Sequence, residues 1–252
     1  MRRLVSALAF LTVIPFPDAW KARKPNAMFA AYPVAAALIG CALAGLGLAC
    51  SLVLPPLLMA IAVAAGGLFL TGGIHLDGLA DCADAFYGRR EKARVLEILK
   101  DPRIGTMGGA AIGLALLTRC AALSALSPRL FLVGVPAAAV LSRTTPSLCL
   151  RLLPYVRSQG ILPPGSSVSA GLTSGSVLVL ALVIAFFPVP SIIALAAVGL
   201  LWLLAWRRIG GCTGDVLGAG IELAEVLFLA ALAAEASRGS LPGVAALLMP
   251  RS

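Results

Sequence analysis

Acidic residues are scarce in this sequence, and so are the patterns that build several common sites. Only 11 of the 252 residues are Asp or Glu, against 20 Lys and Arg, and there is one His. The six Cys include no C-x-x-C pair, which argues against structural zinc and a disulfide framework. The basic residues are scattered between apolar runs and not interleaved with aromatic residues. We therefore expect no nucleic-acid partner, despite the net charge of +9.

Long apolar runs make up most of the rest. Hydrophobic residues account for 60% of the chain, and the mean hydropathy is +0.99. Runs such as 33–53 and 175–206 exceed what a soluble core requires, and they are continuous, whereas the strands of a barrel alternate. Backbone amides in hydrocarbon must be satisfied within their own segment, which favours helices. The sequence predicts an all-α, polytopic integral membrane bundle in a single domain, residues 1–252.

Seven apolar segments can be drawn as transmembrane helices. They cover about residues 30–53, 56–75, 105–126, 130–150, 174–188, 190–206 and 216–236. Residues 1–17 begin like a signal peptide, with Arg2 and Arg3 before an apolar stretch, but a basic segment follows. We expect an uncleaved interfacial helix there, in addition to about seven transmembrane helices.

The positive charges predict the orientation in the membrane. With the N-terminus in the cytoplasm, 15 Lys and Arg fall in inner loops, whereas Arg129, Arg238 and Arg251 fall outside. Inner loops of membrane proteins carry such an excess. The same orientation puts both groups of acidic residues, described next, at the cytoplasmic face.

The carboxylates are concentrated in two clusters. The first comprises Asp77, Asp81, Asp84, Glu91, Glu97 and Asp101, and the second comprises Asp215, Glu222 and Glu225. Asp77, Asp81 and Asp84 are spaced i, i+4 and i+7, so they share one face if the segment is helical. Ionised carboxylates ~6 Å apart repel by roughly 2–3 kcal/mol per pair. Either a positive group must therefore lie among them, or some of them must be protonated.

A divalent cation is the natural partner for these acids. Mg²⁺ is bound in proteins by one or two carboxylates together with substrate phosphates. The second cluster also lies on one helical face, and acids inside an apolar segment face a polar cavity, not lipid. We expect metal ligands among six carboxylates: Asp77, Asp81, Asp84, Asp215, Glu222 and Glu225.

Several cations and the single histidine complete a phosphoryl-transfer site. Two interpretations of His75 are open. It is either a histidine packed in the core, or a metal ligand, a base or a donor that supports a ligand. Arg143, inside an apolar run, is either a phosphate clamp or the partner of a buried carboxylate. Lys100, Arg103 and Arg157 supply further positive charge for phosphate oxygens.

Three stretches of the chain resemble a known family. Residues 72–84 read GGIHLDGLADCAD, residues 97–106 read EILKDPRIGT and residues 211–219 read GCTGDVLGA. In this order they resemble the signatures of cobalamin synthase, the adenosylcobinamide-GDP ribazoletransferase of bacteria and archaea. Weaker likeness extends over nearly the whole chain.

The resemblance implies a transferase of the bacterial inner membrane. Such an enzyme joins adenosylcobinamide-GDP to α-ribazole or its 5′-phosphate, forms adenosylcobalamin or its 5′-phosphate, releases GMP and requires Mg²⁺. We expect membrane lipid around such an enzyme. Whether it forms a homo-oligomer is left open. In this reaction the predicted catalytic residues are Asp77, Asp81, His75, Lys100, Arg103 and Arg143, with Arg157 and Asp101 binding the nucleotide substrate. Either His75 or a carboxylate would accept the hydroxyl proton.

Two other functions use similar residues. A CDP-alcohol phosphotransferase of lipid synthesis also gathers helical aspartates at the cytoplasmic surface, but it has an Arg that the run from Asp77 to Asp81 lacks. A cation transporter would place its acids near the middle of the bilayer, whereas residues 77–101 follow the end of an apolar segment.

Overall fold

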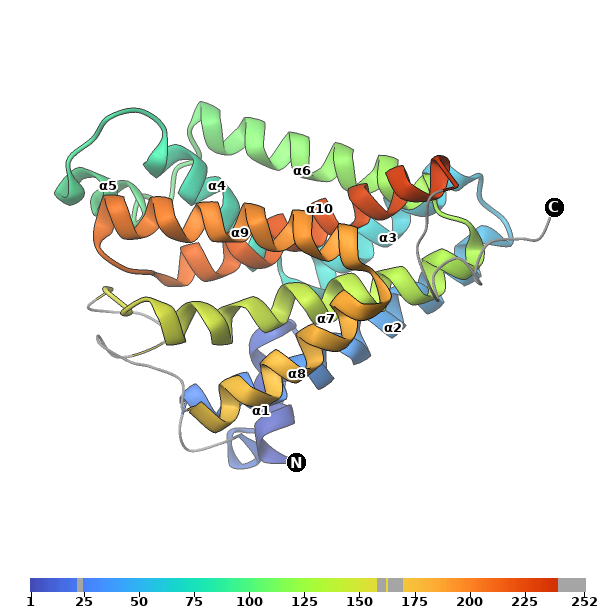
Figure 1. Ribbon diagram of the computed structural model, residues 1–252, viewed down its shortest axis with the longest axis horizontal. Coiled ribbons are helices and arrows are strands. Elements are labelled where there is room, and N and C mark those ends of the chain that lie inside the picture. The colour runs from blue at the N-terminus through green and yellow to red at the C-terminus, as the bar shows by residue number, and fades with distance from the viewer. Residues whose placement is uncertain (22–24, 158–161, 163–169, 240–252) are drawn as a thin grey trace.

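Helices form all the regular secondary structure of residues 1–21, 25–157, 162 and 170–239, which are those that the structure, a computed structural model, describes (Figure 1). The helices are α1 (Arg2–Leu11), η1 (Asp18–Trp20), η2 (Pro25–Ala31), α2 (Tyr32–Ser51), α3 (Pro56–Thr71), α4 (Ile74–Phe86), α5 (Lys92–Ile98), α6 (Thr106–Ala125), α7 (Pro128–Leu152), α8 (Ala170–Phe186), α9 (Pro188–Ile209) and α10 (Gly214–Ser237). The predicted all-α class is confirmed for this part of the chain.

The number of predicted transmembrane helices is confirmed only in part. Within the described residues, four helical segments are long and apolar enough to span a membrane: Ala27–Ser51, α6, α9 and α10. The pair α3 and α4 gives a fifth only if both count as one span across a 90° bend. Every predicted segment overlaps a helix, but α3 alone is short, and α7 carries Arg143 among Ser and Thr residues. The structure thus supports four or five spans, and seven are not confirmed.

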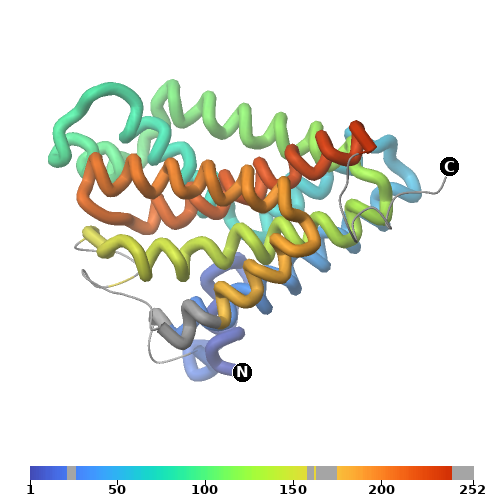
Figure 2. Tube along the Cα trace, viewed as in Figure 1, coloured from blue at the N-terminus to red at the C-terminus, as the bar shows by residue number. Residues whose placement is uncertain are grey.

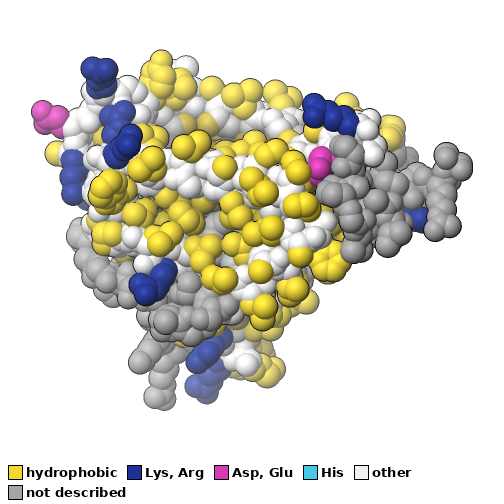
Figure 3. Space-filling view, viewed as in Figure 1, with side chains coloured by type: hydrophobic (Ala, Val, Ile, Leu, Met, Phe, Trp, Pro, Cys, Tyr) yellow, Lys and Arg dark blue, Asp and Glu magenta, His cyan; other side chains and the backbone are white. Residues whose placement is uncertain are grey.

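The surface has the distribution expected of a membrane protein. Figure 3 shows one face on which hydrophobic side chains cover the middle, while Lys and Arg gather towards the ends. On α9 the exposed large apolar side chains are Val189, Ile192, Ile193, Leu200, Leu203, Leu204 and Trp206. Contiguous apolar surface of this kind is suited to lipid.

The last helix, α10, is the centre of the bundle. It packs against α4, α6, α7 and α9 and is largely buried. Figure 2 shows that α4 and α10, far apart in the sequence, lie side by side. The segments that contain the two acidic clusters are thus brought together.

Left-handed glycines create the breaks that position both acidic helices. Gly72 and Gly73 have φ of 64° and 69°, a conformation that costs other residues strain, and they end α3 before the chain turns into α4. Gly210, with φ of 79°, ends α9 in the same way. Cys212 then pairs with Tyr155 in an isolated bridge, and the Thr213 hydroxyl accepts a hydrogen bond from the Val216 amide to cap α10.

The backbones of α4 and α10 meet through glycine. A Cβ added at Gly78 would lie 2.8 Å from the Asp215 carbonyl oxygen and 3.3 Å from the Ala219 nitrogen. A Cβ added at Gly218 would lie 3.3 Å from the Ile74 carbonyl oxygen. Small residues let helices approach this closely in membranes. The contact sets the separation of the two acidic clusters.

We predict that Gly78→Ala destabilises the protein, by about 1–3 kcal/mol, because the added methyl group forces α4 away from α10. Gly113→Ala on α6 is the matched control, since an added Cβ there meets no atom within 4 Å. Thermal unfolding in detergent should give a lower midpoint for Gly78→Ala alone. Equal midpoints for both variants would show that the helices are not in close contact.

Candidate active site

Two aspartates of the first cluster face the second cluster across the α4–α10 contact. Gly78, which abuts the Asp215 backbone, lies between Asp77 and Asp81. Asp77 is exposed and Asp81 is half-buried, and the Asp81 carboxylate experiences the charges of both Asp77 and Asp215. The structure therefore brings together Asp77, Asp81 and Asp215 from two distant segments of the chain.

Asp215 is held in place by the start of α10 and by Arg157. Its Oδ2 accepts a hydrogen bond from the Thr213 hydroxyl at 3.1 Å, and Arg157 Nη1 lies 3.2 and 3.1 Å from its two oxygens. The isolated bridge anchors Arg157, because the Val156 amide donates to the Cys212 carbonyl at 2.9 Å. A carboxylate in the first turn is also favoured by the helix dipole. Asp215 is thus oriented, with a guanidinium beside it.

Asp84 has a different set of partners. Its two carboxylate oxygens accept hydrogen bonds from the Gly105 amide at 2.7 Å and the Gly108 amide at 2.9 Å. These amides belong to the N-terminus of α6, where backbone donors have no helical partner. Asp84 therefore caps α6 and ties the loop before it to α4.

That loop carries the predicted site residues of the stretch 97–106, which are Lys100, Asp101 and Arg103. Arg103 donates two hydrogen bonds to Asp101, from Nε at 2.9 Å and from Nη2 at 2.7 Å. These hydrogen bonds lower the pKa of Asp101 to about 2. Lys100 is exposed. Asp84 ties this loop to α4 and so keeps Lys100 and Arg103 on the side of the α4 acids. Lys100, Asp101 and Arg103 do not line the cavity described next.

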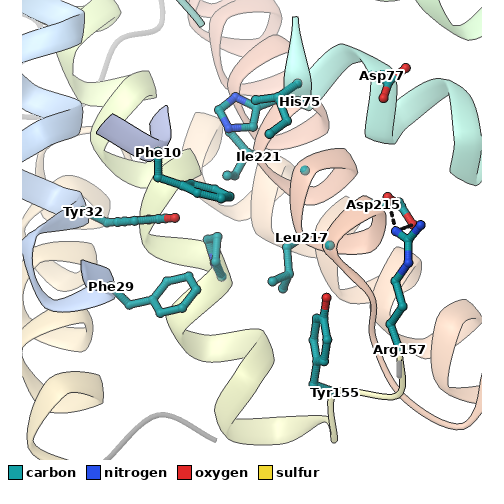
Figure 4. A pocket seen from close by; sticks show the side chains of 14 residues that line it. Phe10, Phe29, Tyr32, His75, Asp77, Tyr155, Arg157, Asp215, Leu217 and Ile221 are labelled. Atoms are coloured by element: carbon teal, nitrogen blue, oxygen red, sulfur yellow. Dashed lines mark hydrogen bonds and ion pairs between the residues drawn. The ribbon is translucent and has the colours of Figure 1, made fainter. Parts of the chain in front are cut away.

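A cavity of about 210 Å³ opens beside the aspartates. Figure 4 shows Asp77, Asp215 and Arg157 on one side of it, and Phe10, Phe29 and Tyr32 on the other. The ring of His75, from the start of α4, lies over the space between them.

Glu222 and Glu225 lie deeper in the bundle and are paired with arginines. Arg119 Nη2 is 2.9 Å from Glu222 Oε1 and 3.3 Å from Glu225 Oε1. Arg143 also forms an ion pair with Glu225. Glu222 is seven residues beyond Asp215, roughly 10 Å along the helix at ~1.5 Å per residue. The sequence left two interpretations of Arg143 open, a phosphate clamp or the partner of a buried carboxylate. In the structure Arg143 is the partner of a buried carboxylate, that of Glu225.

His75 connects the two regions. Besides the larger cavity it lines a small one, about 20 Å³, together with Arg119, Arg143, Glu222 and Glu225. The sequence analysis did not assign a role to Arg119 or to the aromatic residues around the cavity. The rule that an ionisable residue inside an apolar helix has a partner could have found Arg119. No spacing in the sequence indicates Phe10, Phe29 or Tyr32.

The described residues contain no group of three His, Cys, Asp or Glu side chains close enough to enclose a metal ion. Mg²⁺ does not need such a group, because substrate phosphates and water supply most of its ligands. The exposed Asp77 and the half-buried Asp81, with Asp215 nearby, fit this less enclosed kind of site.

Comparison with known proteins gives one consistent result. The family model described as cobalamin-5-phosphate synthase matches residues 3–233. An adenosylcobinamide-GDP ribazoletransferase of Chlorobium chlorochromatii is 38% identical over 234 residues, which cover 88% of this chain and 92% of the relative. Relatives with the same description occur in Chlorobaculum parvum, 37% identical over 91% of this chain and 94% of the relative, and in Azorhizobium caulinodans, 40% identical over 89% and 92%. No solved structure matches the chain significantly.

The capping role of Asp84 predicts an order of stabilities. Asp84→Ala removes both hydrogen bonds to α6 and should cost about 1–2 kcal/mol, whereas Asp84→Asn retains one acceptor oxygen and should cost less. Thermal unfolding in detergent measures both, with Glu91→Ala as control, since that exposed side chain caps nothing. Equal midpoints for wild type and Asp84→Ala would contradict the assignment.

Proposed function

Because this chain belongs to the cobalamin-5-phosphate synthase family, we propose that it transfers the adenosylcobinamide phosphate of adenosylcobinamide-GDP to a ribazole acceptor and releases GMP. The observation that carries the proposal is the meeting of the two acidic segments at Gly78 and Asp215, next to a cavity that also contains a guanidinium. Carboxylates and an arginine at one end of a bundle are what phosphoryl transfer requires.

The reaction breaks a phosphoanhydride bond and forms a phosphate ester bond. A ribose hydroxyl oxygen attacks the phosphorus that carries the aminopropanol arm, and the bond from this phosphorus to the GMP phosphate breaks. GMP leaves with the bridging oxygen. The hydroxyl proton passes to a base, for which His75 or one of the aspartates beside the cavity is suitably located.

Each charged group has a separate task in this proposal. Asp77 and Asp81 would hold Mg²⁺, with Asp215 contributing to the same site. When bound, Mg²⁺ neutralises charge on the phosphate oxygens. Arg157, which is hydrogen-bonded to Asp215, would bind a phosphate of the substrate. We assign Lys100, Asp101 and Arg103 to the departing nucleotide, because their loop is fixed to α4 through Asp84.

We assign Glu222, Glu225 and Arg143 to support of the site. Each of these side chains is already in an ion pair within the bundle. Removing one member of such a buried pair leaves an uncompensated charge, which is strongly destabilising. Together with Arg119 they fix α10 against α6 and α7, and so fix Asp215.

The proposed location is the inner membrane of a bacterium, with the site at the cytoplasmic face. The excess of Lys and Arg in the loops on the side of the acidic segments supports this orientation. The acceptor is either α-ribazole or its 5′-phosphate.

Purified protein in detergent, given Mg²⁺, adenosylcobinamide-GDP and α-ribazole, should release GMP in amounts equal to the cobalamin formed. Chromatography of the nucleotides measures the release, and omission of the acceptor is the control. If adenosylcobinamide-GDP releases no GMP with either α-ribazole or its 5′-phosphate as the acceptor, the proposed function is wrong.

Asp81→Asn should lower turnover about a hundredfold or more, because it removes one of the negative charges proposed to hold the Mg²⁺ that neutralises the phosphates. The matched control is Asp18→Asn, which changes an exposed aspartate paired with Lys21 outside the site. Both variants should elute as folded protein from a sizing column. Full activity of Asp81→Asn would exclude Asp81 as a metal ligand.

A further inference from the structure

The cavity beside the aspartates has two chemically different ends. One end holds Asp77, Asp215 and Arg157, which the proposed function uses for phosphate chemistry. The other end is aromatic and is built from α1, η2 and α2. The side chains of Leu217 and Ile221, one turn apart on α10, line the space between the two ends (Figure 4).

The aromatic end is a compact cluster of rings. The rings of Phe29 and Tyr32 are 4.8 Å apart and tilted by 47°, and those of Phe10 and Tyr32 are 6.4 Å apart and stacked at 22°. Phe29 and Tyr32 are almost completely buried. Phe10 is partly exposed, and aromatic rings pack by their faces or edges against a further aromatic group.

Two buried polar atoms at the cavity have no hydrogen-bond partner among the residues that the structure describes. They are the Tyr32 hydroxyl oxygen and His75 Nε2, on side chains of residues that are 1% and 5% exposed. The Tyr32 hydroxyl points towards the middle of the cavity (Figure 4). A buried polar atom without a hydrogen-bond partner is destabilising. An unpaired polar atom in the wall of a cavity therefore indicates that a ligand bound in the cavity pairs with this atom.

Only one part of the two substrates fits this end. The corrin ring is far too large for a cavity of about 210 Å³. Guanine presents several donors and acceptors along its edges, and the aromatic end offers few partners for them. The base of a ribazole is a flat, mostly apolar, two-ring system with one unprotonated ring nitrogen that accepts a single hydrogen bond.

Resting on the proposed function, we propose that the aromatic end binds the base of the ribazole acceptor, with Tyr32 donating its hydroxyl hydrogen to the ring nitrogen. The rings of Phe10 and Phe29 contact the base. The ribose then lies over Leu217 and Ile221, and its hydroxyl groups are directed towards Asp77 and Asp215. Tyr32 is therefore a residue that determines acceptor specificity, and it does not touch the reacting phosphorus.

The test is Tyr32→Phe, which removes one oxygen atom and keeps the ring. We expect KM for α-ribazole to rise about twofold to tenfold, which is the change in affinity that the loss of one hydrogen bond causes. The dissociation constant, measured with radiolabelled α-ribazole, should rise by the same factor. KM for adenosylcobinamide-GDP should not change. Phenyl riboside, which has no ring nitrogen, should bind wild type and Tyr32→Phe equally. The thermal midpoint should be unchanged or higher, because the hydroxyl has no partner in the folded protein.

Matched substitutions elsewhere provide the controls. Tyr87→Phe removes a hydroxyl from an exposed tyrosine outside the cavity, and it should leave α-ribazole binding unchanged. Phe29→Leu should weaken α-ribazole binding, whereas Phe69→Leu, on the exposed surface of α3, should not.

The outcomes separate this proposal from the proposed function. GMP release by the wild type with unchanged α-ribazole binding in Tyr32→Phe and Phe29→Leu would overturn the pocket assignment alone. Binding of α-ribazole that depends on Tyr32, without GMP release, would support the pocket and reject the reaction. If the wild type does not bind α-ribazole at all, the pocket assignment is also wrong.

Discussion

The close contact between the backbones of α4 and α10 is the constraint on which the site depends. In a chain with only 11 carboxylates, the aspartates of two distant segments meet because glycine at position 78 lets α4 lie against the first turn of α10. Packing of small residues, Gly78 and Gly218 among them, maintains this approach. The ion pairs of Glu222 and Glu225 farther along α10 then hold this helix against its other neighbours.

The same local arrangement occurs at both acidic segments. In each case a left-handed glycine ends an apolar helix, a second glycine follows, and an aspartate lies in the first turn of the next helix. The spacing Gly-Gly-x-x-x-Asp at 72–77 and 210–215 is the sequence counterpart. An abrupt end to one helix frees the amides at the start of the next one, and a carboxylate is stabilised near such an N-terminus.

Much of the architecture follows from the sequence alone, because hydrophobicity and helical spacing are local properties. The all-α class, the positions of the helices and the common face of Asp77 and Asp81 are of this kind. The number of spans does not follow from the sequence alone. It depends on the bend between α3 and α4, which is set by the backbone angles of two glycines. The partners of Asp84 and Glu225 could not be read from spacing either, because Gly105, Arg119 and Arg143 reach them only in the folded bundle. The aromatic end of the cavity comes from three elements with no shared motif.

The pairing of Glu222 and Glu225 with two arginines also affects how ligands approach. Two acids and two guanidinium groups cancel one another in the interior, so this part of α10 contributes little to the field outside. Among the residues that line the larger cavity, Asp77 and Asp215 face the guanidinium of Arg157, and the charge of Asp81 acts close by, which leaves an excess of negative charge. An anionic diphosphate approaching alone would be repelled. We expect the nucleotide substrate to arrive already complexed with its counter-ion, so that electrostatics impose an order of assembly on the site.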